Sequence, residues 1–440
     1  MLLRIILKNI LSFDDEVQFD MFPNPKRTTL PEHVYSEKRD IPLLKQAAIF
    51  GPNASGKSNL VKALEFVRSF VTLKSFLSNI ELEKFFYNLK KDAKKDPISI
   101  AIEFEHNKKT FLYEIEIGLK RVEYEALIET FPLKSTSDIV FERRNKSVTV
   151  GNGHKADYAV AEATKKLIAK NPMSSLLSLN REFPIIPDSR CDIAYKWFRD
   201  KLNVIGVHSF IPSLIDILHS NKTMFEFARQ LIFSLEVGIK DFTLKDEDFD
   251  SWVKQHLKLA GHLPKDMDDI EHLSLNANNT PVWSFSIENG IRKVYSLVFE
   301  NLGKNGYVGH LDSSSQSDGT LRVLTLLPAL YLAIKEGATV VVDELNYCLS
   351  STMVKGIVAF FAESTSNGQL IFTTHDNLLL AEKDYLRSDE VWFVDKKDGS
   401  SKMYSHNDFK EHHTMSIYKG YIEGRYGAIR FINLLRKDAQ

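Results

Sequence analysis

"GPNASGKSN", residues 51–59, is the stretch that decides the fold of this chain. It matches the pattern G-x-x-x-x-G-K-[ST], which marks a phosphate-binding loop when a strand precedes it and a helix follows it. The apolar run Gln46 to Phe50 predicts such a strand, and Leu60 to Leu73 predicts such a helix. Glycines let the backbone curl, so that successive N–H groups and the positive helix N-terminus face phosphate oxygens. The alternative is a glycine-rich strand-to-helix turn with an exposed lysine.

Two side chains of this loop have specific predicted roles. We expect Lys57 to reach the β- and γ-phosphates of ATP and the Ser58 hydroxyl to ligate Mg²⁺. The chain is therefore predicted to bind ATP together with Mg²⁺. The residues expected to form the nucleotide cradle are Gly51, Pro52, Asn53, Ala54, Ser55, Gly56, Lys57, Ser58 and Asn59.

Composition limits the class of protein. A length of 440 residues gives room for two or three domains, or for one large domain with insertions. The 57 basic residues nearly balance the 58 acidic ones, which argues against a protein that coats nucleic acid but leaves room for a local basic patch. The apolar and charged fractions are ordinary for a soluble globular protein, so we expect a sizeable core.

Cysteine usage and hydropathy predict the compartment. Cys191 and Cys348 lie far apart and offer neither a disulfide framework nor a C-x-x-C metal pair, which favours the reducing cytosol. No run approaches 18 apolar residues, and residues 1–9 alternate like a strand instead of forming the apolar core of a signal peptide. We expect a cytoplasmic protein without a membrane partner.

Hydrophobic periodicity predicts an α/β fold in three parts. The first part, 1–156, holds the phosphate-binding loop and a β-rich lobe that begins with alternating strands at 98–104 and 110–118. The second, 157–280, is expected to be a compact helical insertion, since 158–169, 192–202 and 224–237 carry helical spacing. The third, 281–440, begins with a hairpin and then alternates helix and strand, which indicates a parallel sheet.

The third part contains an acidic strand end. The apolar run Thr339 to Val342 is followed by Asp343 and Glu344. We expect Asp343 to hold the Mg²⁺ hydration shell opposite Ser58, and Glu344 to orient or deprotonate the attacking water. Paired acids at a strand end are also common as caps, so the prediction depends on the phosphate-binding loop being present.

A histidine ends the next predicted strand. His375 follows the run Leu370 to Thr374, where its ring can hydrogen-bond the γ-phosphate or the attacking water. The alternative is a histidine that is satisfied locally at the strand terminus.

A third anion site is predicted before a helix. Ser317, Gly319 and Thr320 lead into a helix expected from Leu321 to Ile334, and a serine, a glycine and a helix N-terminus together favour an anion. One chain has no second triphosphate for this site. We therefore expect it to bind the γ-phosphate of ATP held by another subunit, which implies a homodimer or a higher homo-oligomer.

These motifs together resemble a known family. A P-loop, a Ser-x-Gly-Thr signature, an Asp-Glu strand end and a late histidine are similar to ABC-type ATPases of the SMC, RecF and OLD branch. The segments "SDGTLRVLTLLPAL", "VVVDELN", "QLIFTTHDNLLL" and "YIEGRYGAIRFI" resemble more closely the OLD-like ATPases of prokaryotic phage-defence operons, such as RloA/AbiL-like proteins and the ATPase of the PARIS system. The resemblance covers 1–70 and 280–430, and 96–145 loosely.

The resemblance implies roles by position. Gly51, Asn53, Gly56, Lys57, Ser58 and Asn59 take Walker A roles; Ser317, Gly319 and Thr320 form the signature; Asp343 and Glu344 form Walker B; His375 is the switch. The chain departs from the family after Walker B. Where such proteins carry a Ser-Leu-His-Pro-like element, this chain has Cys348-Leu349-Ser350-Ser351. This difference puts the coupling between subunits in question.

The expected function is that of an ATPase with slow turnover. The resemblance implies a sensor or regulatory subunit of an anti-phage defence system, and the stretch after His375 is too short for the nuclease domain that OLD proteins append. The toxin or nuclease effector is therefore expected to be a separate protein. The main alternative is a DNA repair or recombination ATPase of RecF or SMC type that clamps DNA; a transporter ATPase subunit is a third hypothesis.

Overall fold

The computed structural model describes residues 1–35, 41–151, 157–207, 209, 214–235, 238–256, 272–277, 280–364, 367–409 and 416–429. Contacts between residues divide the chain into two compact units. The first comprises Met1–Gly206, Leu332–Asn346 and Val358–Gln440, and the second comprises Val207–Tyr331 and Tyr347–Ile357. The first unit is therefore assembled from both ends of the chain.

An antiparallel sheet forms one layer of the first unit. Alternating apolar residues build it: Ile98, Ile100, Ile102 and Phe104 are all buried on one face of β6. The strands that the sequence predicts at 98–104 and 110–118 are confirmed as β6 and β7. In sheet order the strands are β10 (Ser147–Val150), β9 (Thr136–Arg144), β8 (Val122–Phe131), β7 (Lys109–Ile117), β6 (Ile98–His106), β1 (Leu2–Lys8) and β2 (Val17–Asp20).

A second, mostly parallel sheet carries the predicted motifs. Three of its strands, β5 (Gln46–Phe50), β17 (Thr339–Val342) and β18 (Gln369–Thr373), are short and fully buried, as expected where both faces of a sheet are covered. Every neighbouring pair is parallel except β19 and β20. The sheet order is β11 (Leu202–Ile205), β17 (Thr339–Val342), β18 (Gln369–Thr373), β5 (Gln46–Phe50), β19 (Val391–Lys397) and β20 (Ser400–Ser405).

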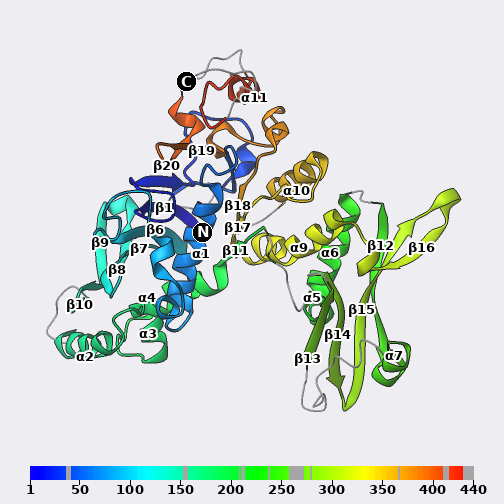
Figure 1. Cartoon of the computed structure of the whole chain (residues 1–440), viewed down its shortest axis with the longest axis horizontal. Coiled ribbons are helices and arrows are strands. Elements are labelled where there is room, and N and C mark those ends of the chain that lie inside the picture. Colours follow the sequence, from blue (N-terminus) through cyan, green and yellow to red (C-terminus); the bar gives the residue numbers. More distant parts are fainter. Residues whose placement is uncertain are drawn as a thin grey trace. The chain divides into compact units, whose positions relative to one another are not determined.

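Helix α1 (Lys57–Thr72) belongs to the core that joins the two sheets (Figure 1). Its buried residues, Leu60, Leu64 and Val67 among them, are in one hydrophobic cluster with residues of β1, β6, β17 and β18. The sheets are also joined by polar contacts, since the backbone N–H of Leu2 donates to the Gln369 side chain over 2.7 Å. The other elements of this unit are α2 (Asp157–Lys170), α3 (Leu176–Glu182), α4 (Ser189–Lys196), α11 (Ile417–Ile422) and the strand pair β3 (Val34–Tyr35) and β4 (Leu43–Leu44).

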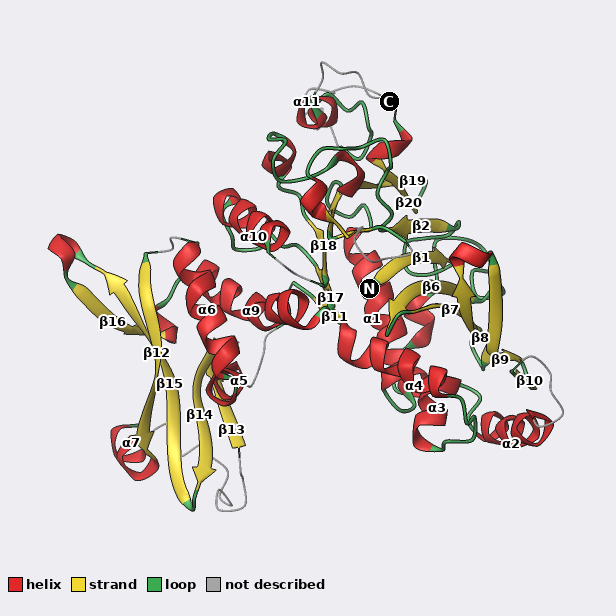
Figure 2. Ribbon diagram, turned by 180° about the vertical axis from the view of Figure 1, so that it is seen from behind, coloured by secondary structure: helices red, strands yellow, loops and turns green. Residues whose placement is uncertain are grey.

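The second unit is built on an antiparallel sheet with helices around it (Figure 2). Helix α6 packs on β12, where Arg229 of the helix pairs with Asp241 of the strand. The strands in sheet order are β12 (Ile239–Asp248), β15 (Ile291–Leu302), β14 (Thr280–Glu288) and β13 (His272–Ala277), with β16 (Val308–Asp312) beside β15. The helices are α5 (Leu214–Ser220), α6 (Lys222–Ser234), α7 (Phe249–Gln255), and parts of α9 (Asp318–Glu336) and α10 (Ser351–Glu363).

The segment 157–280 differs from the helical insertion that the sequence predicts. It contains α2 to α7 but also strands β11, β12 and β13, and it is divided between the two units near Gly206. The helix predicted at 192–202 is confirmed as far as Lys201 by α4 and the π-helical turn Trp197–Lys201, and the chain then enters β11, which pairs in parallel with Thr339–Val342. Within the described ranges, no helix is long and apolar enough to cross a bilayer.

Candidate functional site

The carboxyl ends of three parallel strands meet at one edge of the first unit's parallel sheet. Phe50 of β5 leads into the glycine-rich loop, Val342 of β17 into Asp343, and Thr373 of β18 into Thr374 and His375. Strand β18 lies between β5 and β17, with Thr373 opposite Ile49 and Phe372 opposite Val342. This is the edge at which open α/β sheets bind ligands. The fold thus brings together motifs that are almost 300 residues apart, since Ser58 and Asp343 differ by 285 positions.

Two positions of the loop must be glycine because neighbouring atoms lie too close for a side chain. A Cβ on Gly51 would overlap the carbonyl oxygen of Val394 in β19. Gly56 has φ +117°, and a Cβ there would overlap the Ser401 hydroxyl and lie 2.7 Å from the Ser12 hydroxyl. Only glycine satisfies both the backbone angle and the available space. The loop that the sequence predicts as the nucleotide cradle is thus a crowded turn with no room for a side chain at Gly51 or Gly56.

Two serines support the loop from behind. Ser401 in β20 donates its hydroxyl to the backbone carbonyl of Ser55 over 2.5 Å, and its N–H donates to the Ser12 carbonyl over 2.7 Å. The hydroxyls of Ser12 and Ser401 are 2.7 Å apart, and both residues are buried. The sequence pattern did not mark either residue, because the pair is separated by 389 positions and neither lies in a recognisable motif.

Lys57 begins α1 and lies inside the loop. Its amine donates to the carbonyls of Gly51 over 2.6 Å and Pro52 over 3.1 Å, and the side chain is buried. Burial lowers the pKa of Lys57 below its usual value, while the nearby carboxylates of Glu344 and Asp343 oppose that effect. The amine is thus directed into the loop, where the predicted phosphates would lie.

Ser58, Asp343 and Thr373 form one hydrogen-bonded group. The Ser58 hydroxyl donates to the Asp343 carboxylate over 3.1 Å, and the Thr373 hydroxyl donates to the same oxygen over 2.7 Å. Asp343 is buried and its N–H donates to the Ile205 carbonyl in β11. The hydroxyl and the carboxylate that the sequence assigned to Mg²⁺ are therefore adjacent, and Thr373 is an additional residue that orients the carboxylate.

Glu344 has a strained backbone. Its φ is +47°, in the left-handed region that non-glycine residues rarely occupy. The conformation is held by its N–H, which donates to the Thr373 hydroxyl over 2.8 Å, and by the N–H of Leu345, which donates to the Thr373 carbonyl. Such strain is concentrated at functional sites, and here it turns the chain directly after Asp343.

Asn346 connects the acidic loop to the histidine. Its side-chain oxygen accepts from the Thr374 hydroxyl over 2.8 Å and from the His375 N–H over 3.4 Å, which directs the amide nitrogen toward the ring. That nitrogen is 3.0 Å from Nε2 of the exposed His375. The same nitrogen is 3.3 Å from Nδ1 of that ring, so the amide contacts the imidazole and fixes its position. The only feature of the sequence that points to a role for Asn346 in the site is its position three residues after Asp343.

Most of the remaining loop residues are more exposed to solvent. Asn53 and Ala54 are exposed, Pro52 and Asn59 are half-buried, and Ala54 has φ +63°. Ser55 is buried, and its N–H donates to the Pro52 carbonyl.

The predicted signature lies in the second unit. Ser317 accepts from the N–H of Thr320 over 3.2 Å and caps α9, while the Thr320 hydroxyl is buried 3.0 Å from that of Ser317. A Cβ on Gly319 would lie 3.0 Å from the carbonyl of Cys348, in the segment that replaces the family's His-Pro element. Gly319 and Thr320 therefore have structural roles within the chain, and Ser317 is the exposed member.

The donor set fits Mg²⁺ and a triphosphate. Magnesium prefers oxygen ligands and is commonly bound by one or two protein groups plus phosphates, as Ser58 and Asp343 would provide. In the part of the chain that is described, no cluster of three or more His, Cys, Asp or Glu side chains could hold a metal. The glycine cradle and the buried Lys57 supply the phosphate side of such a site.

The parallel sheet, the loop and the acidic strand end define an α/β P-loop domain of AAA type. The chain belongs to the family described as "AAA domain, putative AbiEii toxin, Type IV TA system", whose family model matches residues 47–381. A comparison with curated proteins finds no match.

Solved structures of SMC head domains are similar at low sequence identity. The Smc head bound to the C-winged helix domain of ScpA is 15% identical, with a TM-score of 0.46 over 95% of this chain and 99% of that one. The SMC head domain from Thermotoga maritima is 13% identical, with a TM-score of 0.41 over 92% and 98%. The Smc head with an extended coiled coil, bound to the C-terminal domain of ScpA derived from Pyrococcus furiosus, is 13% identical, with a TM-score of 0.42 over 97% and 98%.

Proposed function

We propose that this chain binds and slowly hydrolyses ATP as a molecular switch that controls a separate effector protein. The observation that carries the proposal is the hydrogen bond between Ser58 and Asp343, beside the buried amine of Lys57. It joins the start of α1 to the end of β17 at the place where a P-loop ATPase holds Mg²⁺ and the terminal phosphates.

Each residue has a defined task in this proposal. Lys57 exchanges the carbonyls of Gly51 and Pro52 for β- and γ-phosphate oxygens. Ser58 and Asp343 hold Mg²⁺, which neutralises phosphate charge. Glu344 orients the water or accepts its proton, and His375, fixed by Asn346, contacts the γ-phosphate.

A second copy of the chain completes the proposed site. The exposed Ser317 and the start of α9 would contact the γ-phosphate on the other subunit, as a helix N-terminus favours an anion. If ATP favours the closed dimer a hundredfold, it shifts the equilibrium by about 2.7 kcal/mol. That free energy is enough for ATP binding to act as a signal.

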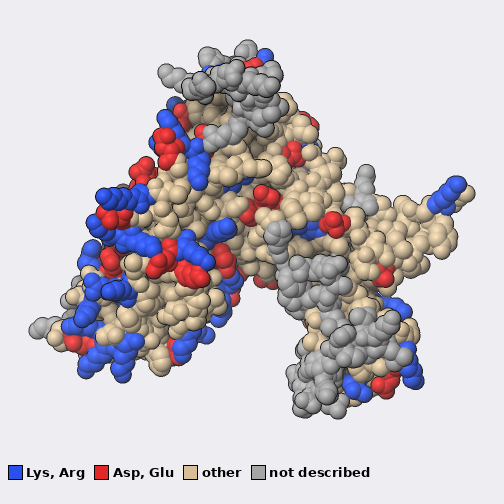
Figure 3. Space-filling model, in the orientation of Figure 1, with Lys and Arg blue, Asp and Glu red and all other residues tan. Residues whose placement is uncertain are grey.

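The proposed effector is a toxin or nuclease of an anti-phage defence system. The family description names a type IV toxin–antitoxin system, which supports a two-component arrangement. Charge also favours a protein partner over DNA. Three of the four lysines between Lys90 and Lys95 contact acids, since Lys90 contacts Asp14, Lys94 contacts Glu83 and Lys95 contacts Asp92. Basic and acidic side chains also alternate over the antiparallel sheet on the face shown in Figure 3.

Nucleotide binding tests the proposal directly. We expect Lys57→Ala to abolish binding of a fluorescent ATP analogue, because the only buried cation directed into the described part of the loop is removed. Lys62→Ala is the matched control, since Lys62 is exposed on the same helix. Wild-type affinity in folded Lys57→Ala protein, as judged by circular dichroism, would refute the P-loop assignment.

A further inference from the structure

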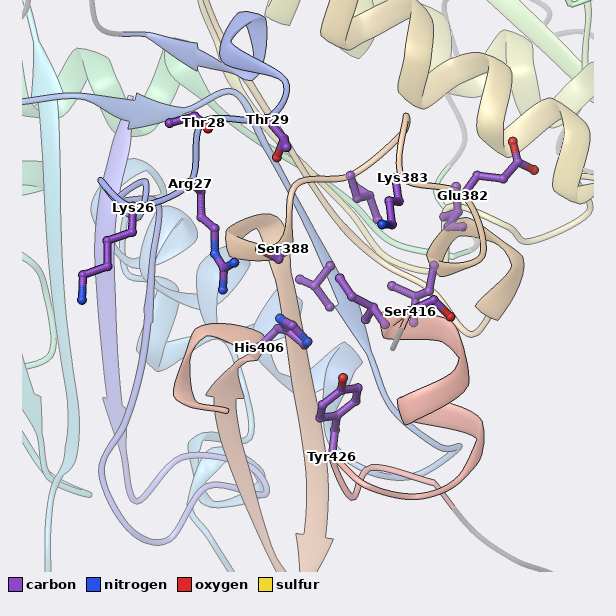
Figure 4. A pocket seen from close by; sticks show the side chains of 15 residues that line it. Lys26, Arg27, Thr28, Thr29, Glu382, Lys383, Ser388, His406, Ser416 and Tyr426 are labelled. Carbon is purple, nitrogen blue, oxygen red and sulfur yellow. The ribbon is translucent and has the colours of Figure 1, made fainter. Parts of the chain in front are cut away.

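A cavity of about 470 Å³ lies in the first unit (Figure 4). Three parts of the chain form it: residues 26–29, residues 379–391 that lead from β18 to β19, and His406 together with residues 416–426 around α11. Small-molecule sites commonly have volumes of about 300–1,000 Å³. The cavity shares no residue with the predicted ATP site.

One wall of this cavity is fixed by a buried ion pair. The guanidinium of Arg387 pairs with Asp389 over 2.8 Å, and both side chains are almost fully buried. The same guanidinium donates to the backbone carbonyls of Arg27 over 3.1 Å and Thr29 over 2.5 Å. Asp389 also accepts from the N–H of Asn24. Residues 24–30 are therefore held in place by a scaffold that does not face the cavity itself.

The opposite wall is the packed end of the described chain. Tyr421 and Tyr426 both stack on Phe393 of β19, each with ring centroids 5.4 Å apart. The Tyr404 hydroxyl donates to the carbonyl of Tyr426 over 2.7 Å, and the Tyr421 hydroxyl donates to that of Ala428 over 2.7 Å. The glycine-containing segment around Tyr426 is thus part of the structure of this unit and gives the cavity a rigid aromatic side.

Charge in the cavity is positive. Among the described residues that line the cavity, Lys26, Arg27 and Lys383 are basic and Glu382 is acidic, which gives three positive charges and one negative charge, a net charge of +2. Figure 4 shows the Lys383 amine directed toward the centre, and the Arg27 guanidinium on the same side as the His406 ring. The carboxylate of Glu382 and the amine of Lys26 are directed away from the centre. The groups that face the cavity therefore favour an anion.

The rest of the lining is divided between hydroxyls and apolar side chains. Hydroxyls can donate to the oxygens of an anion, and the apolar groups can cover a flat organic ring. The hydroxyl-bearing residues are Thr28, Thr29, Ser388, Ser416 and Tyr426, and the apolar ones are Leu379, Leu380, Leu386, Val391 and Ile417.

We propose that this cavity binds an organic phosphate of the size of a nucleoside monophosphate. The phosphate would lie at Arg27 and Lys383, with hydroxyl donors around it, and the organic ring would lie against the leucines and Tyr426. The site is independent of the proposed ATPase function, since its residues belong to other segments.

Titration calorimetry on the full chain tests this site. The Lys57→Ala variant is titrated separately with AMP, GMP, CMP, UMP, adenosine and inorganic phosphate, so that the glycine-rich loop does not contribute. We expect at least one nucleoside monophosphate to bind at least tenfold more tightly than adenosine or inorganic phosphate. Adding Lys383→Glu is expected to weaken that binding at least tenfold, whereas adding Lys26→Glu leaves it within twofold, because both lysines are exposed but only Lys383 faces the cavity.

Three results would overturn the inference. One is the absence of binding for all four nucleoside monophosphates at millimolar concentration. The second is inorganic phosphate or adenosine binding as tightly as the nucleotide, which would show that the cavity does not recognise both the phosphate and the organic ring. The third is an equal effect of Lys383→Glu and Lys26→Glu, which would indicate non-specific attraction. Because the loop is disabled throughout, none of these results depends on ATP hydrolysis.

Discussion

At the scale of single residues, Lys57 combines burial with contact to two carbonyl oxygens. Burial lowers its pKa from the usual 10.5, and bound phosphates would raise it again. Between those two pKa values the free protein carries neutral Lys57 and the complex carries the charged form. ATP binding is therefore expected to take up as much as one proton between those two pKa values, and over that interval the affinity for ATP is expected to fall up to about tenfold per pH unit as pH rises.

Calorimetry in two buffers of different ionisation enthalpy measures this proton uptake. Lys57→Arg is the control, because a guanidinium stays protonated throughout the range. That variant should show no uptake from this position. Equal proton uptake in the wild type and in Lys57→Arg would place the titrating group elsewhere.

At the scale of elements, the end of strand β18 holds two different parts of the site with two adjacent threonines. Thr373 contacts Asp343 and the N–H of Glu344, whereas Thr374 contacts Asn346. Thr373→Val leaves the N–H of Glu344 without its partner at a cost of about 1–3 kcal/mol. We expect it to raise the Mg²⁺ concentration needed for ATP binding about tenfold. Thr374→Val should instead lower turnover, because Asn346 no longer fixes His375.

Mg²⁺ titrations of nucleotide binding and steady-state ATPase assays on both variants separate these roles. Each threonine serves as the control for the other, since the substitution and the strand are the same. If both variants change Mg²⁺ requirement and turnover in parallel, the two threonines act only on the stability of the strand end.

The sequence predicted those parts of the site that lie in continuous motifs. Gly56, Lys57 and Ser58 are adjacent in the chain, and the strand before them and the helix after them are close in sequence. The sequence motif is therefore sufficient to predict how these three residues are arranged. The motif could not indicate Ser12 and Ser401, because their contact with the loop depends on β20 packing against the turn that contains Ser12. Likewise, β11 becomes a strand because β17 provides a buried partner, which no local spacing encodes.

At the scale of the whole molecule, the proposal requires two copies of the chain around ATP. Glu344→Gln should retain ATP binding, block hydrolysis and accumulate an ATP-bound dimer, since the amide cannot accept the proton of the attacking water. Light scattering after gel filtration would then give a mass near twice 50.3 kDa with ATP and near 50.3 kDa without it. A monomeric mass in saturating ATP would contradict the two-copy site.

Ser317 provides a sharper test of how such a dimer forms. Its hydroxyl caps α9 by accepting from the N–H of Thr320, and both Asp and Asn can replace it as helix caps. In the Glu344→Gln background, Ser317→Asp keeps the cap but places a negative charge where the partner's γ-phosphate would lie, so it should prevent the ATP-dependent dimer. Ser317→Asn keeps the cap without the charge and should still allow the dimer. If the two variants dimerise equally with ATP, Ser317 does not face a phosphate, and any dimer is held by another surface.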